Sequence, residues 1–143
     1  MPPSSAPRPP PSPAPSQGPS GVGLDLVDVP RFALALERHG EGLRRRVFTA
    51  REWTYAASRG ADRAAVLAVR FAAKEAVFKV LGTGWGRGVG WQDVEIAGGG
   101  RSAPALVLSG RAAELASERG VRLEISLSHA GAMAGAVAIA VPR

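Results

Sequence analysis

The chain has 143 residues, enough for one domain of ordinary size, and 45% of them are hydrophobic. With 18 basic and 12 acidic residues, its formal net charge of +6 indicates an anionic partner, such as nucleic acid, a phosphorylated small molecule or an acidic protein. It contains no cysteine and only two histidines, His39 and His129, which excludes disulfides, iron–sulfur clusters and thiolate zinc and leaves oxygen ligands for any metal.

Residues 1–20 form a leader rich in proline and serine, with no apolar stretch whose burial would offset the entropy cost of ordering. We therefore expect this leader to be disordered and a single domain to occupy residues 21–143. The leader lacks the patterns of secretory signals and transit peptides, and no apolar run reaches the roughly 18 residues that span a membrane. A cytoplasmic location without a membrane partner is expected.

The domain is expected to open with a strand and two helices. Apolar residues at period two predict a strand over residues 21–28, and Pro30 suits the first turn of a helix that runs to His39–Gly40. Thr49 and Glu52 have the spacing of a capping box, so a second helix should begin there.

A third and longer helix is expected from about Asp62, its N-cap, to Leu81, where Gly82 ends it. The pattern then changes to short strands, with a hairpin around three glycines (residues 91–96 and 105–108), a helix (111–119) and two further strands (122–127 and 133–141). The order βαααββαββ, with helices early and strands late, predicts an α+β domain.

Two acidic residues lie where the pattern favours apolar ones. Asp25 lies within the first strand, where aspartate is rare, and it either caps a strand end or serves a function. Glu75 lies at the edge of the apolar stripe of the third helix, where a carboxylate must be paired or bound to a cation. Pairing with Lys79, one turn further on, would add only about 0.3–0.5 kcal/mol. If strand and helix pack together, Asp25 and Glu75 converge as two oxygen ligands for Mg²⁺ beside a phosphate within reach of Lys79.

Two further segments are open to either a structural or a functional interpretation. The glycine-rich residues 82–88 follow the C-terminal end of a helix, so they form either a cap and connector or a close backbone approach to a ligand. They fit neither a Walker nor a dinucleotide-binding register. His129 lies in a small-residue turn after a strand, where it is either structural or presented at the rim of the sheet. The adjacent Ser128 would point to the other face, so no Ser-His-Asp pattern is present.

Together these fragments resemble holo-acyl-carrier-protein synthase, the small bacterial 4′-phosphopantetheinyl transferase. The similar segments occur in order over residues 21–141: residues 23–28 with Arg31, residues 70–76 with Lys79 and Gly82-Thr83-Gly84, residues 91–96, and residues 126–129. The resemblance implies that Asp25 and Glu75 bind Mg²⁺ together with the diphosphate of coenzyme A. It also implies that the coenzyme A site is lined by Arg70, Lys79, Gly82, Thr83, Gly84 and His129, and that the protein is a homotrimer with sites between subunits.

The reaction implied is transfer of the phosphopantetheine arm from coenzyme A to a serine of an apo acyl carrier protein, releasing adenosine 3′,5′-bisphosphate. Glu75, directly or through a bound water, is the expected base, and Lys79 is expected to neutralise charge on the phosphates. The carrier can belong to fatty-acid or polyketide synthesis. Because such carriers are acidic, basic residues around the first helix either form its docking face or a solvated surface: Arg31, Arg38, Arg44, Arg45 and Arg46.

Two competing interpretations are a nucleic-acid-binding module and an inactive coenzyme A-binding scaffold. The first is suggested by the basic charge and four aromatic residues, but these are scattered over helices and a loop rather than spaced along one strand: Trp53, Tyr55, Trp85 and Trp91. The second is favoured only by Ala130, which follows His129 where some relatives carry an acidic or threonine-type residue. We therefore expect an enzyme, with no nucleic-acid partner.

Overall fold

The computed structural model describes residues 19–83 and 88–143. Its elements are, in chain order, β1 (Gly21–Asp28), α1 (Val29–Arg46), α2 (Ala50–Ala57), the 3₁₀ turn η1 (Gly60–Asp62), α3 (Arg63–Leu81), the 3₁₀ turn η2 (Trp91–Asp93), β2 (Val94–Ala97), β3 (Ala105–Leu108), α4 (Gly110–Glu118), β4 (Val121–Ala130) and β5 (Met133–Pro142). Apart from the two 3₁₀ turns the order is βαααββαββ, which confirms the predicted α+β class.

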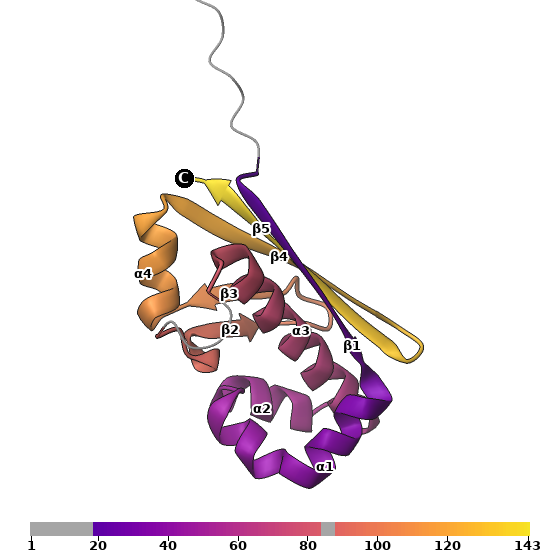
Figure 1. The fold of residues 1–143 in the computed structure, drawn as a ribbon. Coiled ribbons are helices and arrows are strands. Elements are labelled where there is room, and N and C mark those ends of the chain that lie inside the picture. Colours follow the sequence, from indigo (N-terminus) through magenta and orange to yellow (C-terminus); the bar gives the residue numbers. More distant parts are fainter. Residues whose placement is uncertain (1–18, 84–87) are drawn as a thin grey trace, which may run out of the picture.

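Helix α3 is the centre of the fold and lies against one face of a three-stranded antiparallel sheet of order β1-β5-β4 (Figure 1). Residues of α1 and α2 pack on its N-terminal half, whereas residues of α4 and of the β2-β3 hairpin pack on its C-terminal half. Because neighbours surround it, α3 lacks a broad polar face, and even its charged Arg70 and Lys74 are buried.

The helix approaches the sheet closely because the residues between them are small. The side chains of β5 that face α3 are all alanines, each at most 2% exposed: Ala134, Ala136, Ala138 and Ala140. On β1 the corresponding position is Gly23, where an added Cβ would lie 2.1 Å from the carbonyl oxygen of Ala76. Strand β1 therefore comes closest to α3 at Gly23, two residues before Asp25, and Asp25 lies on the same face of the strand.

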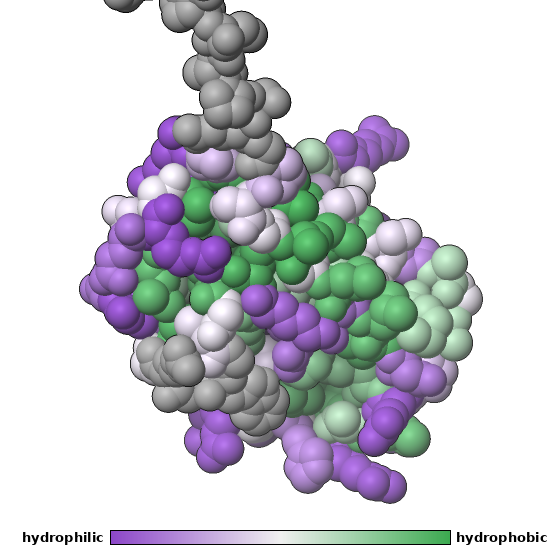
Figure 2. Space-filling model, turned by 45° about the horizontal axis from the view of Figure 1, so that its top comes forward, coloured by the Kyte–Doolittle hydropathy of each residue, from purple (hydrophilic) through white to green (hydrophobic). Residues whose placement is uncertain are grey.

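On the opposite face of this sheet, β1 and β5 are apolar and no other described element covers them, whereas β4 presents polar residues such as Glu124 and Ser126 there. Val22, Leu24 and Leu26 of β1 are 68%, 55% and 62% exposed, and the register places Val137 and Ile139 of β5 beside them. We call these five residues the apolar strand face. The hydrophobic area that crosses the middle of the surface in Figure 2 agrees with these exposures.

Most predicted helices and strands are confirmed, and their ends differ from the prediction where tertiary contacts determine them. The α2 capping box between Thr49 and Glu52 is present in both directions, and Gly82 ends α3 in the left-handed region with φ 71°. Asp62 occupies the N-cap of α3 without a side-chain capping bond. The predicted hairpin is confirmed as the antiparallel pair β2-β3.

The first helical segment ends at the predicted His39–Gly40, because His39 has non-helical dihedral angles (φ −130°, ψ 23°). A further helical segment continues across this kink to Arg46, and its Leu43 packs into the same apolar cluster as Phe32. One expectation was wrong. Residues 91–93 form a 3₁₀ turn rather than the start of a strand. Of the two interpretations of Asp25, the strand-end one is excluded, because Asp25 lies in the middle of β1, opposite Ala136. Within the described part of the chain, no helix has the length and apolar character needed to cross a membrane.

Candidate active site

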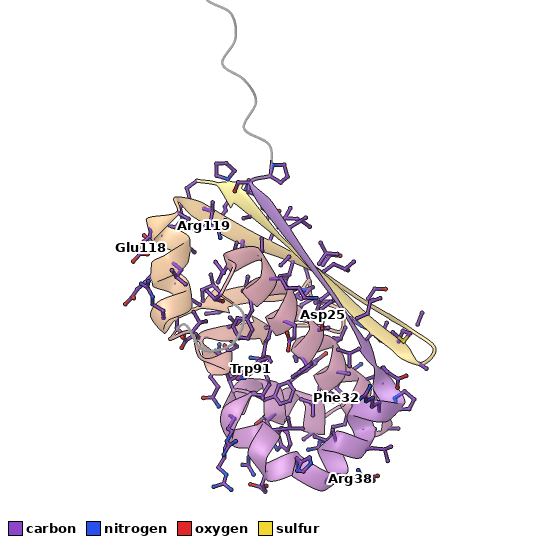
Figure 3. The ribbon with its side chains drawn as sticks, in the orientation of Figure 1. Asp25, Phe32, Arg38, Trp91, Glu118 and Arg119 are labelled. Atoms are coloured by element: carbon purple, nitrogen blue, oxygen red, sulfur yellow. The ribbon has the colours of Figure 1, made fainter. Side chains whose placement is uncertain are left out.

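Asp25 and Lys79 meet between β1 and α3, as Figure 3 shows for the labelled aspartate. The ammonium Nζ of Lys79 lies 3.1 Å from Oδ1 of Asp25 and 2.7 Å from the carbonyl oxygen of Leu24. The Asp25 side chain is 19% exposed and that of Lys79 is 52% exposed. The lysine thus binds the strand that carries Asp25, a contact that the sequence analysis did not include.

Glu75 is half-buried and lies one helical turn before Lys79, so both side chains leave the same side of α3. Gly23 and Asp25 lie on the same face of β1, the face that points to α3. Because Gly23 contacts α3 at Ala76, Asp25 lies beside the part of the helix that carries Glu75. The residues of this side offer two carboxylates, the donor type that Mg²⁺ prefers when a substrate phosphate and water supply its remaining ligands. Across the described residues no group of three or more histidine, aspartate or glutamate side chains is suited to hold a metal by itself. The donor set therefore fits a metal shared with a substrate.

The second group of predicted residues lines a cavity of about 440 Å³, which we call the arginine pocket. Its walls come from α2, α3, β4 and the β2-β3 turn, and they include Tyr55, Arg59, Arg70, Gly99 and His129. Two arginines and a histidine there accompany a single carboxylate, that of Asp62. This volume and this excess of basic groups suit an anionic small molecule.

Arg70 lies in the wall of this pocket and is almost completely buried, with 3% of its surface exposed. Its guanidinium donates a hydrogen bond to the carbonyl oxygen of Gly98 and stacks over the ring of Tyr55, 4.6 Å from the ring centroid. Its Nε has no hydrogen-bond partner among the described residues. Burial lowers the pKa of Arg70 from its usual value, and the negative charge of Glu52 opposes that shift. A buried cation with an unpaired donor is prepared to receive an anion.

The two groups lie on different sides of α3 within one chain. Arg70 and Lys79 are nine residues apart, which is about half a turn of rotation at about 100° per residue. Asp25 and His129 belong to β1 and β4, the two edge strands separated by β5, and neighbouring strands are about 4.8 Å apart. One chain therefore does not bring all the predicted site residues together.

The predicted glycine segment is only partly described. Gly82 caps α3, and Thr83 is 9% exposed with no hydrogen-bond partner for its Oγ1 among the described residues. Gly84 lies outside the described residues. The structure therefore supports the capping interpretation for Gly82.

The five arginines of the predicted docking face are all exposed on α1. Figure 3 shows Arg38 on the outer side of the helix, away from the core. Arg31, Leu34 and Arg38 follow at spacings of three and four, so an exposed leucine lies between two arginines on one helical stripe. Arg44 forms a long ion pair with Glu41, at 3.8 Å, and its guanidinium lies 5.9 Å from the ring centroid of Trp53.

The sequence did not indicate Tyr55 and Arg59 as pocket residues, or Lys74 and Glu52 as a pair. Lys74 Nζ lies 2.8 Å from Glu52 Oε1, and both side chains are fully buried. The capping box had already identified Glu52, but its second interaction spans 22 residues and is not readable from local spacing. Two of the aromatic residues that suggested nucleic-acid binding pack against other side chains: Trp91 stacks on Phe71 with ring centroids 5.2 Å apart, and Trp53 lies under Arg63. Tyr55 lines the arginine pocket, and Trp85 lies outside the described residues.

Comparison with known proteins agrees with this geometry. Residues 21–140 match the 4′-phosphopantetheinyl transferase superfamily. The chain is 48% identical over 122 residues to the holo-[acyl-carrier-protein] synthase of Desulforudis audaxviator, covering 85% of this chain and 92% of that protein. It is 42% identical over 120 residues to the enzyme of that name from Geotalea daltonii, covering 83% and 95%.

Solved structures give the same result at the level of the fold. A complex of the Chronobacterium ammoniagenes synthase with coenzyme A has a TM-score of 0.72 at 32% identity, covering 86% of this chain and 97% of that one. The holo-[acyl-carrier-protein] synthase of Neisseria meningitidis has a TM-score of 0.74 at 27% identity, covering 86% and 98%. The chain therefore belongs to the 4′-phosphopantetheinyl transferase superfamily. Within it, the relatives named above are holo-[acyl-carrier-protein] synthases.

Proposed function

We propose that the protein transfers the 4′-phosphopantetheine arm of coenzyme A to a serine of an apo acyl carrier protein. The observation that carries this proposal is the pairing of an arginine pocket with a separate carboxylate-and-lysine group, in a chain whose relatives bear that activity by name. The serine oxygen forms a bond to the β-phosphorus of the diphosphate, and the bond from that phosphorus to the bridging oxygen breaks. Adenosine 3′,5′-bisphosphate leaves with the bridging oxygen.

The arginine pocket is the proposed place for the phosphorylated adenosine part of coenzyme A. Arg70 offers a buried positive charge with an unpaired Nε, and His129 and Arg59 line the same cavity. Guanidinium groups bind phosphates through charge-assisted hydrogen bonds, which hold the substrate at a defined position. Positioning of this kind is a large part of catalysis when two substrates must meet.

Asp25 and Glu75 are the proposed ligands of a Mg²⁺ ion, which when bound would supply positive charge to the diphosphate oxygens. Lys79 already lies 3.1 Å from Asp25, so its ammonium is placed to stabilise negative charge that develops on the same oxygens. Glu75 is our candidate for the group that accepts the proton of the serine hydroxyl. An inactive coenzyme A-binding scaffold would need Glu75 as a metal ligand but not as a proton acceptor.

A homotrimer would complete the site. Because the two groups lie on different sides of α3, a neighbouring subunit that presents its arginine pocket to Asp25 and Lys79 would unite them. The apolar strand face provides a surface for such an interface, since exposed apolar areas of this kind mark contacts between proteins. Symmetric closure of three copies then gives three equivalent sites.

The carrier protein is proposed to dock on the exposed stripe of α1. Arg31 and Arg38 would attract the acidic surface of the carrier, and Leu34 between them, at 53% exposed, would make an apolar contact. This face belongs to the helix that directly follows β1, so a carrier bound there lies close to the strand that holds Asp25.

The direct test is the mass of a purified apo acyl carrier protein after incubation with this protein, coenzyme A and Mg²⁺. We expect the carrier to gain the mass of the phosphopantetheine arm, and a carrier whose acceptor serine is replaced by alanine to stay unchanged. Chelation of the metal should stop the reaction. An unmodified carrier at high enzyme concentration would refute the proposed function.

A further inference from the structure

Two layers of contacts join α2, α3 and strand β2, one above the other. In the first, Glu52 of α2 and Lys74 of α3 form a buried ion pair that also bonds to the backbone around β2. In the second, Tyr55 of α2 and Arg70 of α3 stack, and Arg70 bonds to the carbonyl oxygen of Gly98 directly after β2. Tyr55 follows Glu52 by three residues and Arg70 precedes Lys74 by four, so the two layers are one helical turn apart.

The first layer is fully bonded. Lys74 Nζ donates to Glu52 Oε1, to the carbonyl oxygen of Trp91 at 3.0 Å and to that of Val94, which uses all three of its protons. Glu52 Oε1 also accepts from the amide of Thr49 at 2.9 Å, and Oε2 accepts from the amide of Ile96 at 3.4 Å. This ion-pair layer fixes the mutual distance of three elements by directional bonds.

The second layer forms a wall of the arginine pocket and has little room for movement. A Cβ added to Gly99 would lie 2.9 Å from Oη of Tyr55 and 3.3 Å from Nη2 of Arg70. The glycine turn is therefore in contact with both side chains. A shift of α2 or β2 by a fraction of an ångström would move the pocket wall, and the buried ion-pair layer beside it, together with the largely exposed Arg51–Glu95 pair between α2 and β2, resists such a shift with charged bonds.

Stability alone does not account for this ion pair. Well-packed apolar residues often stabilise a core as well as a buried ion pair does, because removing two charges from water is costly. Apolar side chains, however, do not fix distances in the way that hydrogen bonds to four backbone groups do. The charges support the same conclusion: among the described residues, Arg70 and Lys74 are two buried cations and Glu52 is the one buried carboxylate, which Lys74 contacts directly. Arg70 feels the charge of Glu52 but forms no ion pair with it, so its guanidinium can still interact with an anionic ligand.

We propose that Lys74, held by Glu52, is a positioning residue that sets the geometry of the coenzyme A pocket through Arg70, Tyr55 and the Gly98–Gly100 turn. The proposal rests on the function proposed above. Lys74 does not touch substrate, and its effect is on the binding of coenzyme A rather than on the chemical step.

The test compares Glu52→Gln and Lys74→Met with Val77→Ala, all in the intact protein. Val77 is fully buried on α3 but belongs to neither layer, so its truncation lowers stability without touching the pocket wall. We expect both layer variants to raise the KM for coenzyme A by at least about tenfold, because displacement of positioning groups by about an ångström has effects of up to a hundredfold. The kcat at saturating coenzyme A and the KM for the carrier should remain near wild type.

The possible outcomes distinguish a failure of the positioning role from a failure of the proposed transferase function. An unchanged KM for coenzyme A in the layer variants, or an equal rise in Val77→Ala at a matched loss of thermal stability, would overturn the positioning role while leaving the proposed function intact. Glu52→Gln keeps the size of the side chain and an acceptor for Lys74. If Lys74→Met does not fold, the KM of Glu52→Gln for coenzyme A alone tests the positioning role. A wild-type protein that modifies no carrier would instead overturn the proposed function.

Discussion

Asp25 shows how a single residue can be placed by the backbone around it. The strand reaches α3 because Gly23 has no side chain, and Lys79 then binds both the carboxylate of Asp25 and the carbonyl oxygen of Leu24. The aspartate is thereby kept on the helix side of β1, away from the apolar strand face. Its position in the middle of a strand, unfavourable by propensity, is consistent with a functional role.

Replacing Asp25 with asparagine should separate activity from stability. The Asp25–Lys79 pair is partly exposed, and such pairs contribute at most about 1 kcal/mol, so the melting temperature should change little. The rate of transfer should fall by at least about a hundredfold, the typical cost of removing a charged group that stabilises a transition state. Mass spectrometry of the carrier over a series of Mg²⁺ concentrations measures the rate. A wild-type rate at limiting Mg²⁺ would remove Asp25 from the metal site.

Adding a methyl group at Gly23 should be costly. The alanine Cβ would overlap the carbonyl oxygen of Ala76 and force α3 away from β1, a kind of overpacking that costs about 1–3 kcal/mol. Gly23→Ala should therefore lower the melting temperature and also reduce transfer, because Asp25 moves with the strand. The matched control is Gly42→Ala in α1, where no atom lies within 4 Å of the added Cβ and the change should stabilise the helix by about 0.5–1 kcal/mol. Equal melting temperatures for the two variants would contradict the close contact.

Helices and strands were predictable where their signals are local. The capping box at Thr49 and the αL glycine at Gly82 act within one turn, so sequence spacing was enough to predict the start of α2 and the end of α3. The 3₁₀ turn at residues 91–93 was missed because Lys74, from another element, bonds to the carbonyl oxygens of Trp91, the first residue of that turn, and of Val94, the residue after it. Tertiary contacts of this kind override the strand propensity of the segment.

The stripe on α1 is the element whose function is most directly testable. Arg31→Gln together with Arg38→Gln should raise the KM for the carrier by roughly tenfold at low salt, because charge attraction raises the rate of encounter. The KM for coenzyme A should stay constant. Added salt should reduce the difference between wild type and variant, since screening weakens the attraction that the variant has lost.

The control for this experiment is Arg111→Gln on α4, at the other end of the molecule (Figure 1). It leaves α1 intact but removes one positive charge where the α1 variant removes two, so the rise in carrier KM is compared per charge removed. An equal rise per charge in the control would mean that overall charge, not the stripe on α1, governs docking. A carrier KM that does not respond to salt in the wild type would argue against electrostatic docking altogether.

At the scale of the whole molecule, the arrangement of the predicted site residues depends on packing between distant elements. The similarity to a known family indicated Asp25, Glu75, Arg70 and His129 and implied sites between subunits, and the structure places Lys79 and Arg70 on different sides of α3. The spacing of nine residues between Arg70 and Lys79 was visible, and on a helix it places them on opposite sides. The buried partner of Lys74 was not predictable, because α2 and α3 are brought together only by the packed fold.

Mixing two inactive variants tests whether neighbouring subunits share a site. Asp25→Asn disables the carboxylate half of every site and Arg70→Ala disables the pocket half, so each variant alone should transfer almost nothing. If each site takes its carboxylate half from one subunit and its pocket half from the next, refolding the two together in equal amounts makes some sites with both halves intact. Random assortment in a closed ring gives about a quarter of the wild-type sites.

The recovered activity should therefore be about a quarter of the wild-type rate per chain, and it should appear only after dissociation and reassembly, not on simple mixing of stable oligomers. Sedimentation analysis of the same samples reports the number of subunits. A charged substitution in the apolar strand face, Leu24→Glu, should lower both the oligomeric state and the recovered rate, because it puts an unpaired charge into the proposed interface. Mixtures that stay inactive after reassembly, although the oligomer forms, would show that each chain builds its site alone.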